Sequence, residues 1–169
     1  MKAKLIIEGK EIEIEISEEE CKKLRPPKEK ETGYKRIPDQ NGYFYVNAKG
    51  EVEYSVDLYD YIDDKYYNSA NYYSSKEVAE NNARADKLVR QLRRFAVEHN
   101  ECEVNFNNTN TEKYHVYYDY ETDALGVGLV LRTKNFGATY FDSEETAQAA
   151  IDEFRDELIW YFTEYKDSL

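Results

Sequence analysis

Two stretches of this chain, residues 70–79 and 138–147, match in residue order at a constant offset of 68. Each begins with an aromatic pair, continues with a residue that can cap a helix, and ends in an acidic first turn. In both copies the aromatic pair is expected to pack beneath the following helix, whose dipole the acids offset. Such an order also arises by convergence, but we favour the duplication of one hairpin–strand–helix unit.

The apolar pattern predicts an α+β fold. Alternation of apolar and polar residues ahead of each repeat predicts β-hairpins, and apolar spacings of three and four predict two long amphipathic helices. Ser74 with Glu77, and Asp142 with Glu145, match the capping box that begins a helix. Residues 57–71, which have no clear period, are expected to form an ordered loop, and residues 101–106 a strand. Two repeats would then form an antiparallel sheet with both long helices on one face.

The sequence ahead of the repeats predicts a separate N-terminal element. Residues 11–16 alternate strictly between Glu and Ile, which is typical of a half-buried strand. Ser17 and Glu20 fit the capping box of a short helix, and the Pro26-Pro27 pair ends it. The expected organisation is a ββα element at 1–24, a charged linker at 25–37 and a main α+β domain at 38–169, with repeat units at about 43–99 and 101–165.

The charge of the chain bears on its partners. The 169 residues include Lys+Arg 23 and Asp+Glu 35, a net charge of −12, and 17 tyrosines. An acidic field repels nucleic acid and attracts basic protein surfaces, although acids also simply keep a Tyr-rich chain soluble. No apolar run approaches the roughly 20 residues of a membrane span, and no apolar signal segment follows the first Met. We therefore expect a cytoplasmic protein that has no membrane partner.

The densest group of acids predicts a protein-binding surface. Between residues 51 and 64 there are six acids and no base, and tyrosines are interleaved with them. Tyrosine provides contact area at low entropic cost, and acids provide charge complementarity, although half of these tyrosines could belong to the core. Acids of the last helix would extend this surface. The candidate partner-binding residues are Asp57, Tyr59, Asp60, Tyr61, Asp63, Asp64, Tyr66, Tyr67, Asp152, Asp156 and Glu157.

A basic stripe on the first long helix supports an alternative. Four bases recur at spacings of 3, 3 and 4, so that they share one helix face, and a fifth lies beside them. Such a stripe can contact phosphates, or it can pair with acids of the last helix or of another subunit. In a chain this acidic, pairing is the favoured interpretation. The alternative nucleic-acid-binding residues are Arg84, Lys87, Arg90, Arg93 and Arg94.

The sequence has no catalytic signature. It contains neither a Gly-x-Ser-x-Gly elbow nor a phosphate-binding glycine loop. His99 and His115 lie at no metal-ligand spacing, and we expect both to be structural. The acids between 57 and 64 could hold a hard cation, but the spacing of a calcium-binding loop is absent. We expect no enzymatic activity, no cofactor and no metal ion.

Three parts of the chain resemble small proteins encoded by phages and prophages of Firmicutes. They are Gly-Lys-Glu-Ile-Glu-Ile with Ser-Glu-Glu-Glu in residues 9–20, Tyr-Phe-Tyr-Val-Asn with Gly-Glu-Val in 43–52 and Asn-Tyr-Tyr before the helix at 71–73, and the ending at 147–162. The resemblance covers most of the chain and implies origin in a mobile element. It brings no catalytic residues.

Small acidic phage accessory proteins often block host defence, including CRISPR nucleases, sometimes by imitating the charge of DNA. By this analogy the resemblance implies a non-enzymatic inhibitor of a bacterial defence nuclease such as Cas9, an anti-CRISPR protein that binds the basic nucleic-acid channel of the nuclease–guide RNA complex. The alternatives are a nucleic-acid-binding phage accessory protein that uses the basic helix face, or an oligomeric structural phage protein.

Overall fold

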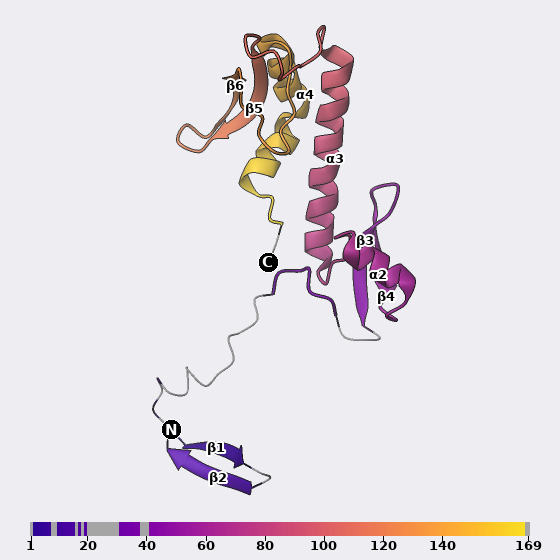
Figure 1. Cartoon of the computed structure of the whole chain (residues 1–169), viewed down its shortest axis with the longest axis vertical. Helices are drawn as coiled ribbons and strands as arrows, with labels where there is room; N and C mark the ends of the chain where they lie inside the picture. Colours follow the sequence, from indigo (N-terminus) through magenta and orange to yellow (C-terminus); the bar gives the residue numbers. More distant parts are fainter. Residues whose placement is uncertain are drawn as a thin grey trace. The chain divides into compact units, whose positions relative to one another are not determined.

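The computed structural model describes residues 2–7, 10–15, 17, 19, 31–37 and 41–167 and divides the chain into two compact units, Met1–Glu31 and Thr32–Leu169 (Figure 1). The first unit contains an antiparallel hairpin of β1 (Lys2–Ile7) and β2 (Lys10–Glu15). Most of the helix expected at 17–24 and the first part of the expected linker lie outside the described residues.

The described residues of the second unit form two hairpins and three helices, so the predicted α+β class is confirmed. The two hairpins do not join into the single sheet that we expected. Each pairs with one aromatic residue ahead of a helix, through the antiparallel bridges Phe44–Tyr73 and Tyr114–Phe141. The elements are β3 (Gly42–Val46), β4 (Val52–Val56), α2 (Tyr61–Asn68), α3 (Lys76–His99), β5 (Lys113–Asp119), β6 (Ala124–Val130) and α4 (Glu144–Thr163).

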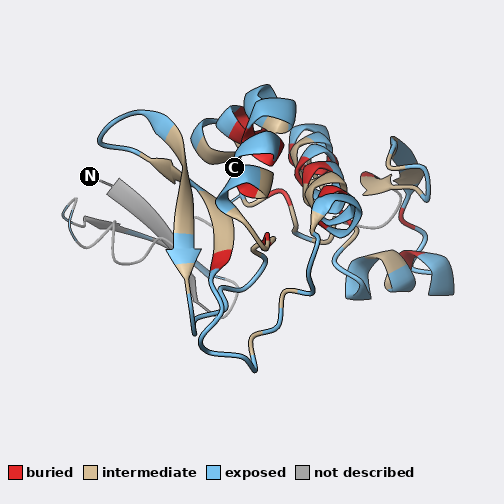
Figure 2. Cartoon of the chain, turned by 90° about the horizontal axis from the view of Figure 1, so that it is seen from above, coloured by how far each residue is buried: buried red, intermediate tan, exposed pale blue. Residues whose placement is uncertain are grey.

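The hairpins stay apart because they pack at opposite ends of α3. Near its beginning, Val78 and Ala79 pack with Tyr73 beneath the first hairpin, and near its end Phe95 packs with Phe141. Val78 and Phe95 are about 25 Å apart along the axis, at about 1.5 Å per residue, which is too far for two hairpins to share a ladder. Figure 2 shows buried residues along both α3 and α4.

The two repeats use equivalent residues, as the offset of 68 predicts. Tyr73 and Phe141 form the bridges, while Ala79 and Ala147 are both 0 % exposed. The predicted equivalence of the tyrosines one position earlier is also confirmed. Both are buried, and each hydroxyl accepts a backbone N–H, whereas the aromatic residues that pack against the helices are Tyr73 and Phe141. The donors are Ile37 for Tyr72, at 3.2 Å, and Asn135 for Tyr140, at 2.6 Å.

The predicted N-caps are wrong by one residue in both copies. The caps are Ser75 and Ser143, whose hydroxyls accept the N–H of Val78 at 3.4 Å and of Thr146 at 3.1 Å. The residue before each cap still belongs to the extended segment, because its own N–H is bonded elsewhere: that of Ser74 donates to the Gly33 carbonyl at 2.7 Å.

Two further predictions from the sequence are wrong. Residues 61–68, expected in a loop, form α2, which Asp60 caps in a reciprocal capping box with Asp63. Residues 101–106 form no strand. Alternation there has no neighbouring strand to pair with, and the Cys102 N–H donates instead to the Asp142 carboxylate at 2.7 Å.

Helix α4 bends back onto α3. At Phe154 the backbone leaves helical geometry, with φ −110° and ψ 19°. After this kink, the Trp160 ring lies under the Arg84 guanidinium at 3.8 Å, and the Tyr165 hydroxyl donates to Asn82 at 3.1 Å. Both repeats are thereby tied to α3. None of the described helices is long and apolar enough to span a membrane.

The observed caps give a test of the local structure. We expect Ser75→Ala and Ser143→Ala each to lower the free energy of unfolding by about 1 kcal/mol, because each removes the acceptor for a first-turn N–H. Ser74→Ala is the matched control and should change stability by less than about 0.5 kcal/mol. Urea denaturation measures all three. An equal loss in Ser74→Ala would contradict the observed cap.

Candidate functional site

The predicted acids at 57–64 form an ionic cluster around Arg36. The guanidinium binds the Asp57 carboxylate in a bidentate pair at 2.9 and 3.1 Å, and it binds Asp64 at 2.7 Å. Asp57 is fully buried and also accepts the Tyr72 hydroxyl at 2.9 Å and the Tyr59 N–H at 2.8 Å. The bonds from Arg36, with those from Tyr59 and Tyr72, hold the pKa of Asp57 at about 2. The charge of Asp57 is therefore neutralised within the folded chain by Arg36 and is not available to a partner.

The carboxylates of Asp60 and Asp63 also accept hydrogen bonds from within the chain. Asp63 is buried and accepts the Tyr43 hydroxyl at 2.9 Å and the Leu58 N–H at 2.8 Å. Asp60 remains exposed, but its carboxylate accepts the Ile62 N–H at 2.7 Å and the Asp63 N–H at 3.1 Å. The structure thus removes Asp57 and Asp63 from the candidate contact surface, because buried carboxylates cannot touch a partner.

The tyrosines of this segment divide into supporting and exposed residues. Tyr66 is half-buried against the Tyr45 ring at 4.3 Å. Tyr59 and Tyr67 lie over the Arg36 guanidinium at 4.3 and 5.4 Å, yet both rings remain about half exposed. Tyr61 is 72 % exposed. Four large side chains within five successive residues stay at least half exposed, and we name them the α2 apolar patch: Leu58, Tyr59, Tyr61 and Ile62.

Arg36 was missed because its segment was expected to be a linker. Residues 32–37 are instead part of the second unit and pack against the first repeat, since the Gly33 carbonyl accepts the Ser74 N–H, and Tyr34 packs on Tyr73 with ring centroids 5.3 Å apart. A signal was present in the sequence. Six acids without a base between residues 51 and 64 need a cation from elsewhere in the chain.

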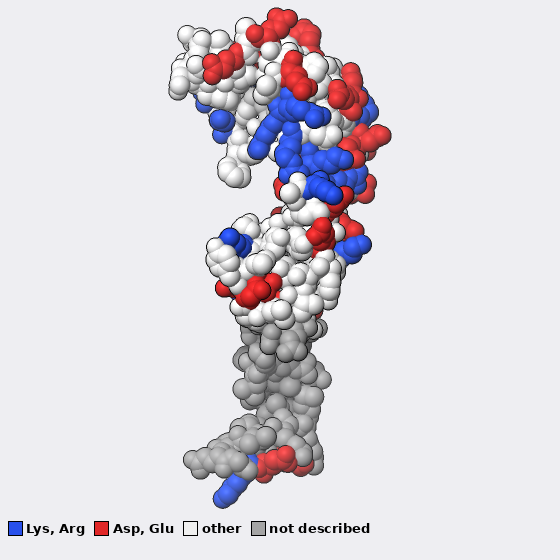
Figure 3. Space-filling view, turned by 90° about the vertical axis from the view of Figure 1, so that its right-hand side faces the viewer, with Lys and Arg blue, Asp and Glu red and all other residues white. Residues whose placement is uncertain are grey.

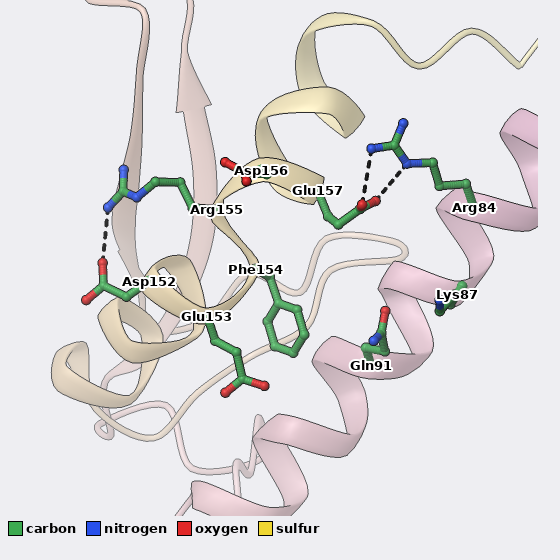
Figure 4. Close-up of a pocket in the computed structure, with 9 residues that line it drawn as sticks. All are labelled: Arg84, Lys87, Gln91, Asp152, Glu153, Phe154, Arg155, Asp156 and Glu157. Carbon is green, nitrogen blue, oxygen red and sulfur yellow. Dashed lines mark hydrogen bonds and ion pairs between the residues drawn. The ribbon is translucent and has the colours of Figure 1, made fainter.

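The predicted acids of α4 line a groove between α3 and α4 of about 730 Å³. Glu157 binds the Arg84 guanidinium at 2.8 and 3.1 Å, which lowers the pKa of Glu157. Figure 4 shows that Asp152 pairs with Arg155, at 3.0 Å, on the side of α4 away from α3. These acids flank the middle of α3, whereas the 57–64 acids lie near its beginning, so the two predicted acidic groups do not form one surface.

The basic stripe is only partly neutralised. Arg84 pairs with Glu157, as the pairing interpretation predicts. Arg94 approaches Glu98 only at 3.9 Å, and three more bases are exposed with no ion pair among the described residues. Figure 3 shows a large patch of Lys and Arg side chains on the second unit, with acidic side chains at its border. We name the exposed bases the basic face of α3: Lys87, Arg90, Arg93 and Arg94.

The histidines contact aromatic residues rather than metal ligands. His99 stacks on Phe95 at 3.9 Å, and its Nδ1 lies 2.9 Å from the Phe95 carbonyl. His115 packs near Tyr140. Within the described ranges, no three His, Cys, Asp or Glu side chains are grouped to hold a metal ion.

Lys113 is a buried cation that no sequence pattern indicated. This side chain is 1 % exposed, and its ammonium donates to the carbonyls of Asn108, Thr111 and Leu131 at 2.6, 2.8 and 3.0 Å. Three carbonyl acceptors satisfy its three donors. Lys113 therefore fastens the 108–111 loop to the end of β6.

The Arg36 cluster can be tested with two matched variants. Asp57→Asn should cost about 3 kcal/mol of stability, because it breaks a buried pair. Asp64→Asn has the same partner and the same chemistry, but its side chain is 51 % exposed, so it should cost less than about 1 kcal/mol. Guanidinium denaturation at neutral pH measures both. Equal losses would contradict the burial of the Asp57 pair.

The same cluster gives a pH dependence. The pKa of Asp57 in the folded chain, about 2, lies below the value of about 4 expected in the unfolded chain. The stabilisation is therefore complete above about pH 5 and is lost as the pH falls toward 2. In thermal melts, Asp57→Asn should flatten this acid limb; a limb as steep as that of the wild type would contradict the assignment.

Comparison with known proteins gives no relative. No family, no curated protein and no solved structure matches this chain. Two surfaces of the second unit are candidate binding sites, the α2 apolar patch and the basic face of α3.

Proposed function

We propose that the protein is a non-enzymatic binding protein that recognises a basic protein surface through the α2 apolar patch. One observation carries this proposal: Leu58, Tyr59, Tyr61 and Ile62 are 51–72 % exposed within five successive residues. Large apolar and aromatic side chains at such exposure are typical of the centre of a protein interface. A patch this short fits a pocket or channel wall on a partner.

The support beneath the patch favours binding. The capping box of Asp60 and Asp63 fixes the start of α2, and the Arg36–Asp57 pair holds the segment ahead of it. Tyr59 is held at both ends, because its ring covers Arg36 and its hydroxyl donates to the Ile37 carbonyl at 3.2 Å. Side chains that are ordered before binding lose less entropy when a partner arrives.

The charge around the patch indicates the sign of the partner. Asp60 is exposed within the patch segment, Asp64 is half-buried one turn further along, and the whole chain carries −12. Acids at the rim of an apolar centre accelerate the encounter with a basic surface and disfavour acidic partners. A basic protein surface is therefore the partner class that this patch fits.

The resemblance to phage proteins supports a narrower form of the proposal. The partner would be a bacterial defence nuclease, such as a Cas nuclease–guide RNA complex, in the cytoplasm of the host cell. The nucleic-acid channel of such an enzyme is basic, and it contains clefts that exposed tyrosines can enter. The protein would then act as an anti-CRISPR inhibitor by occupying the channel.

The test compares two double variants in a DNA cleavage assay with purified Cas9–guide RNA complex. Wild-type protein should inhibit cleavage, and Tyr61→Ala/Ile62→Ala should inhibit about 10- to 100-fold less strongly, because it removes the apolar centre. Val97→Ala/Leu129→Ala removes two exposed apolar side chains elsewhere, 84 and 49 % exposed, and should inhibit as the wild type does.

Inhibition by Tyr61→Ala/Ile62→Ala at wild-type strength would contradict the role of the patch. If the wild type has no effect on Cas9, that nuclease is excluded, and the same three proteins are used for capture from a Gram-positive bacterial lysate. A basic nucleic-acid-binding protein retained by wild type and control, but lost from the patch variant, supports the partner class. Identical capture by all three contradicts it.

A further inference from the structure

The basic face of α3 has the opposite sign to the α2 apolar patch, so it does not fit the same partner. We propose that this face, together with the loop at 132–137, is a binding site for single-stranded nucleic acid. The proposal is independent of the proposed function, because the two surfaces share no residue. It rests on unpaired cations, a fully exposed aromatic ring and an apolar groove that meet around Arg93.

The cations are arranged along one side of α3. Lys87, Arg90 and Arg94 follow one another at helical spacing, and Lys87 to Arg94 covers about 10 Å at about 1.5 Å per residue. Successive phosphates of a single strand are roughly 6 to 7 Å apart, so the face can contact two or more of them. Lys87, Arg90 and Arg93 have no ion pair among the described residues, so they need not leave a partner to bind phosphate.

The acids near this face do not cancel it. Asp86 is exposed on α3 beside it, Glu98 approaches Arg94 at 3.9 Å, and Glu157 is held by Arg84. Two further acids, Glu153 and Asp156, line the α3–α4 groove that Lys87 also lines, so they act at the Lys87 end of the face, while Arg93 lies at the groove on the other side. At physiological salt, charges farther away than about 8 Å are largely screened. A phosphate at the face therefore experiences mainly the local cations, although the chain as a whole carries −12.

An apolar groove of about 420 Å³ adjoins the basic face. It runs between α3, β5, the 135–139 segment and the end of α4, and Arg93 is part of its wall. Its other walls include the half-buried apolar side chains Val89, Leu92, Val116, Tyr161 and Phe162. A flat apolar ring, such as a nucleobase, can enter a groove of this kind next to a cation that binds its phosphate.

The loop at 132–137 adds an aromatic ring and two more cations. Phe136 lines the groove and is fully exposed, at 108 % of its reference area. Arg132 and Lys134 are exposed, and Lys134 lines a neighbouring hollow together with Arg93. An exposed aromatic side chain among Lys and Arg side chains is typical of surfaces on which unpaired nucleobases stack.

This combination favours a single strand over a duplex or an acidic protein. In a duplex the faces of the bases are stacked on one another, so neither the groove nor Phe136 could reach them. An acidic protein surface would pair with the cations but would leave the ring and the groove without a matching flat partner. Single-stranded DNA or RNA supplies both the phosphates and the free base faces.

The test is fluorescence anisotropy of the full chain with a labelled oligo-dT 15-mer, an oligo-U 15-mer and a duplex of the same length. In about 50 mM salt we expect the single strands to bind more tightly than the duplex. With about four phosphate contacts, raising the salt fourfold should weaken single-strand binding by about 50-fold. Binding of dT and U measures the preference between DNA and RNA.

Three variants locate the site. Arg90→Glu/Arg93→Glu should abolish binding, and Lys65→Glu/Lys166→Glu, which changes the net charge equally at other exposed positions, should weaken it only a few-fold. Phe136→Ala should weaken binding by about tenfold and Phe136→Tyr should restore it, because stacking is lost and regained. Each variant should keep the circular dichroism spectrum and melting temperature of the wild type, since all of these side chains are exposed.

Several results would overturn the proposal: no binding of either single strand at low salt, equal binding of the duplex, or equal losses in the charge variant and its control. A salt-sensitive dimer in native mass spectrometry that Arg90→Glu/Arg93→Glu dissolves, without oligonucleotide binding, would instead assign the face to a second copy of the chain. Tyr61→Ala/Ile62→Ala should bind the oligonucleotides as the wild type does, which separates this test from that of the proposed function.

Discussion

The second unit depends on one long helix that is buried at both ends by different partners. The first turns of α3 pack Val78 and Ala79 beneath the β3–β4 hairpin, and its last turns pack Phe95 and Ala96 with Phe141 of the second repeat. Neither two-stranded hairpin has enough apolar surface to be stable alone. Each therefore depends on α3, and stability lost at one end of the helix is expected to weaken the other.

The two helices of the repeats differ in shape: α3 is continuous and contacts both hairpins, whereas α4 is kinked. The kink of α4 at Phe154 turns the end of this helix back toward α3. Trp160 then lies under Arg84, and Glu157 binds the same guanidinium from the other side of the groove. The end of α4 thereby covers part of α3.

The repeat, the hairpins and the long helices could be predicted from sequence because each depends on local periodicity and on pairs of residues close in the chain. The contacts that these elements make with distant parts of the chain could not be predicted in this way. The cap shifts from Ser74 to Ser75 because a distant carbonyl, that of Gly33, takes the Ser74 N–H. Helix α2 has no apolar period, since its tyrosines face both a core and solvent. The segment that contains Arg36 was predicted to be a linker, because the carboxylates that Arg36 binds, those of Asp57 and Asp64, lie more than 20 residues further along the chain.

The candidate site shows why net charge predicts a surface poorly. Composition counts every ionised group, but a partner meets only those that folding leaves free. Between residues 57 and 64, the carboxylates of Asp57 and Asp63 are buried and bonded, so the most acidic stretch offers tyrosines more than charge. Among the five bases from Arg84 to Arg94, by contrast, only Arg84 has a short ion pair, and a chain of −12 keeps a basic patch on its surface. An unpaired cluster of the minority sign cannot be attributed to solubility, because it reduces the net charge that keeps the protein dispersed.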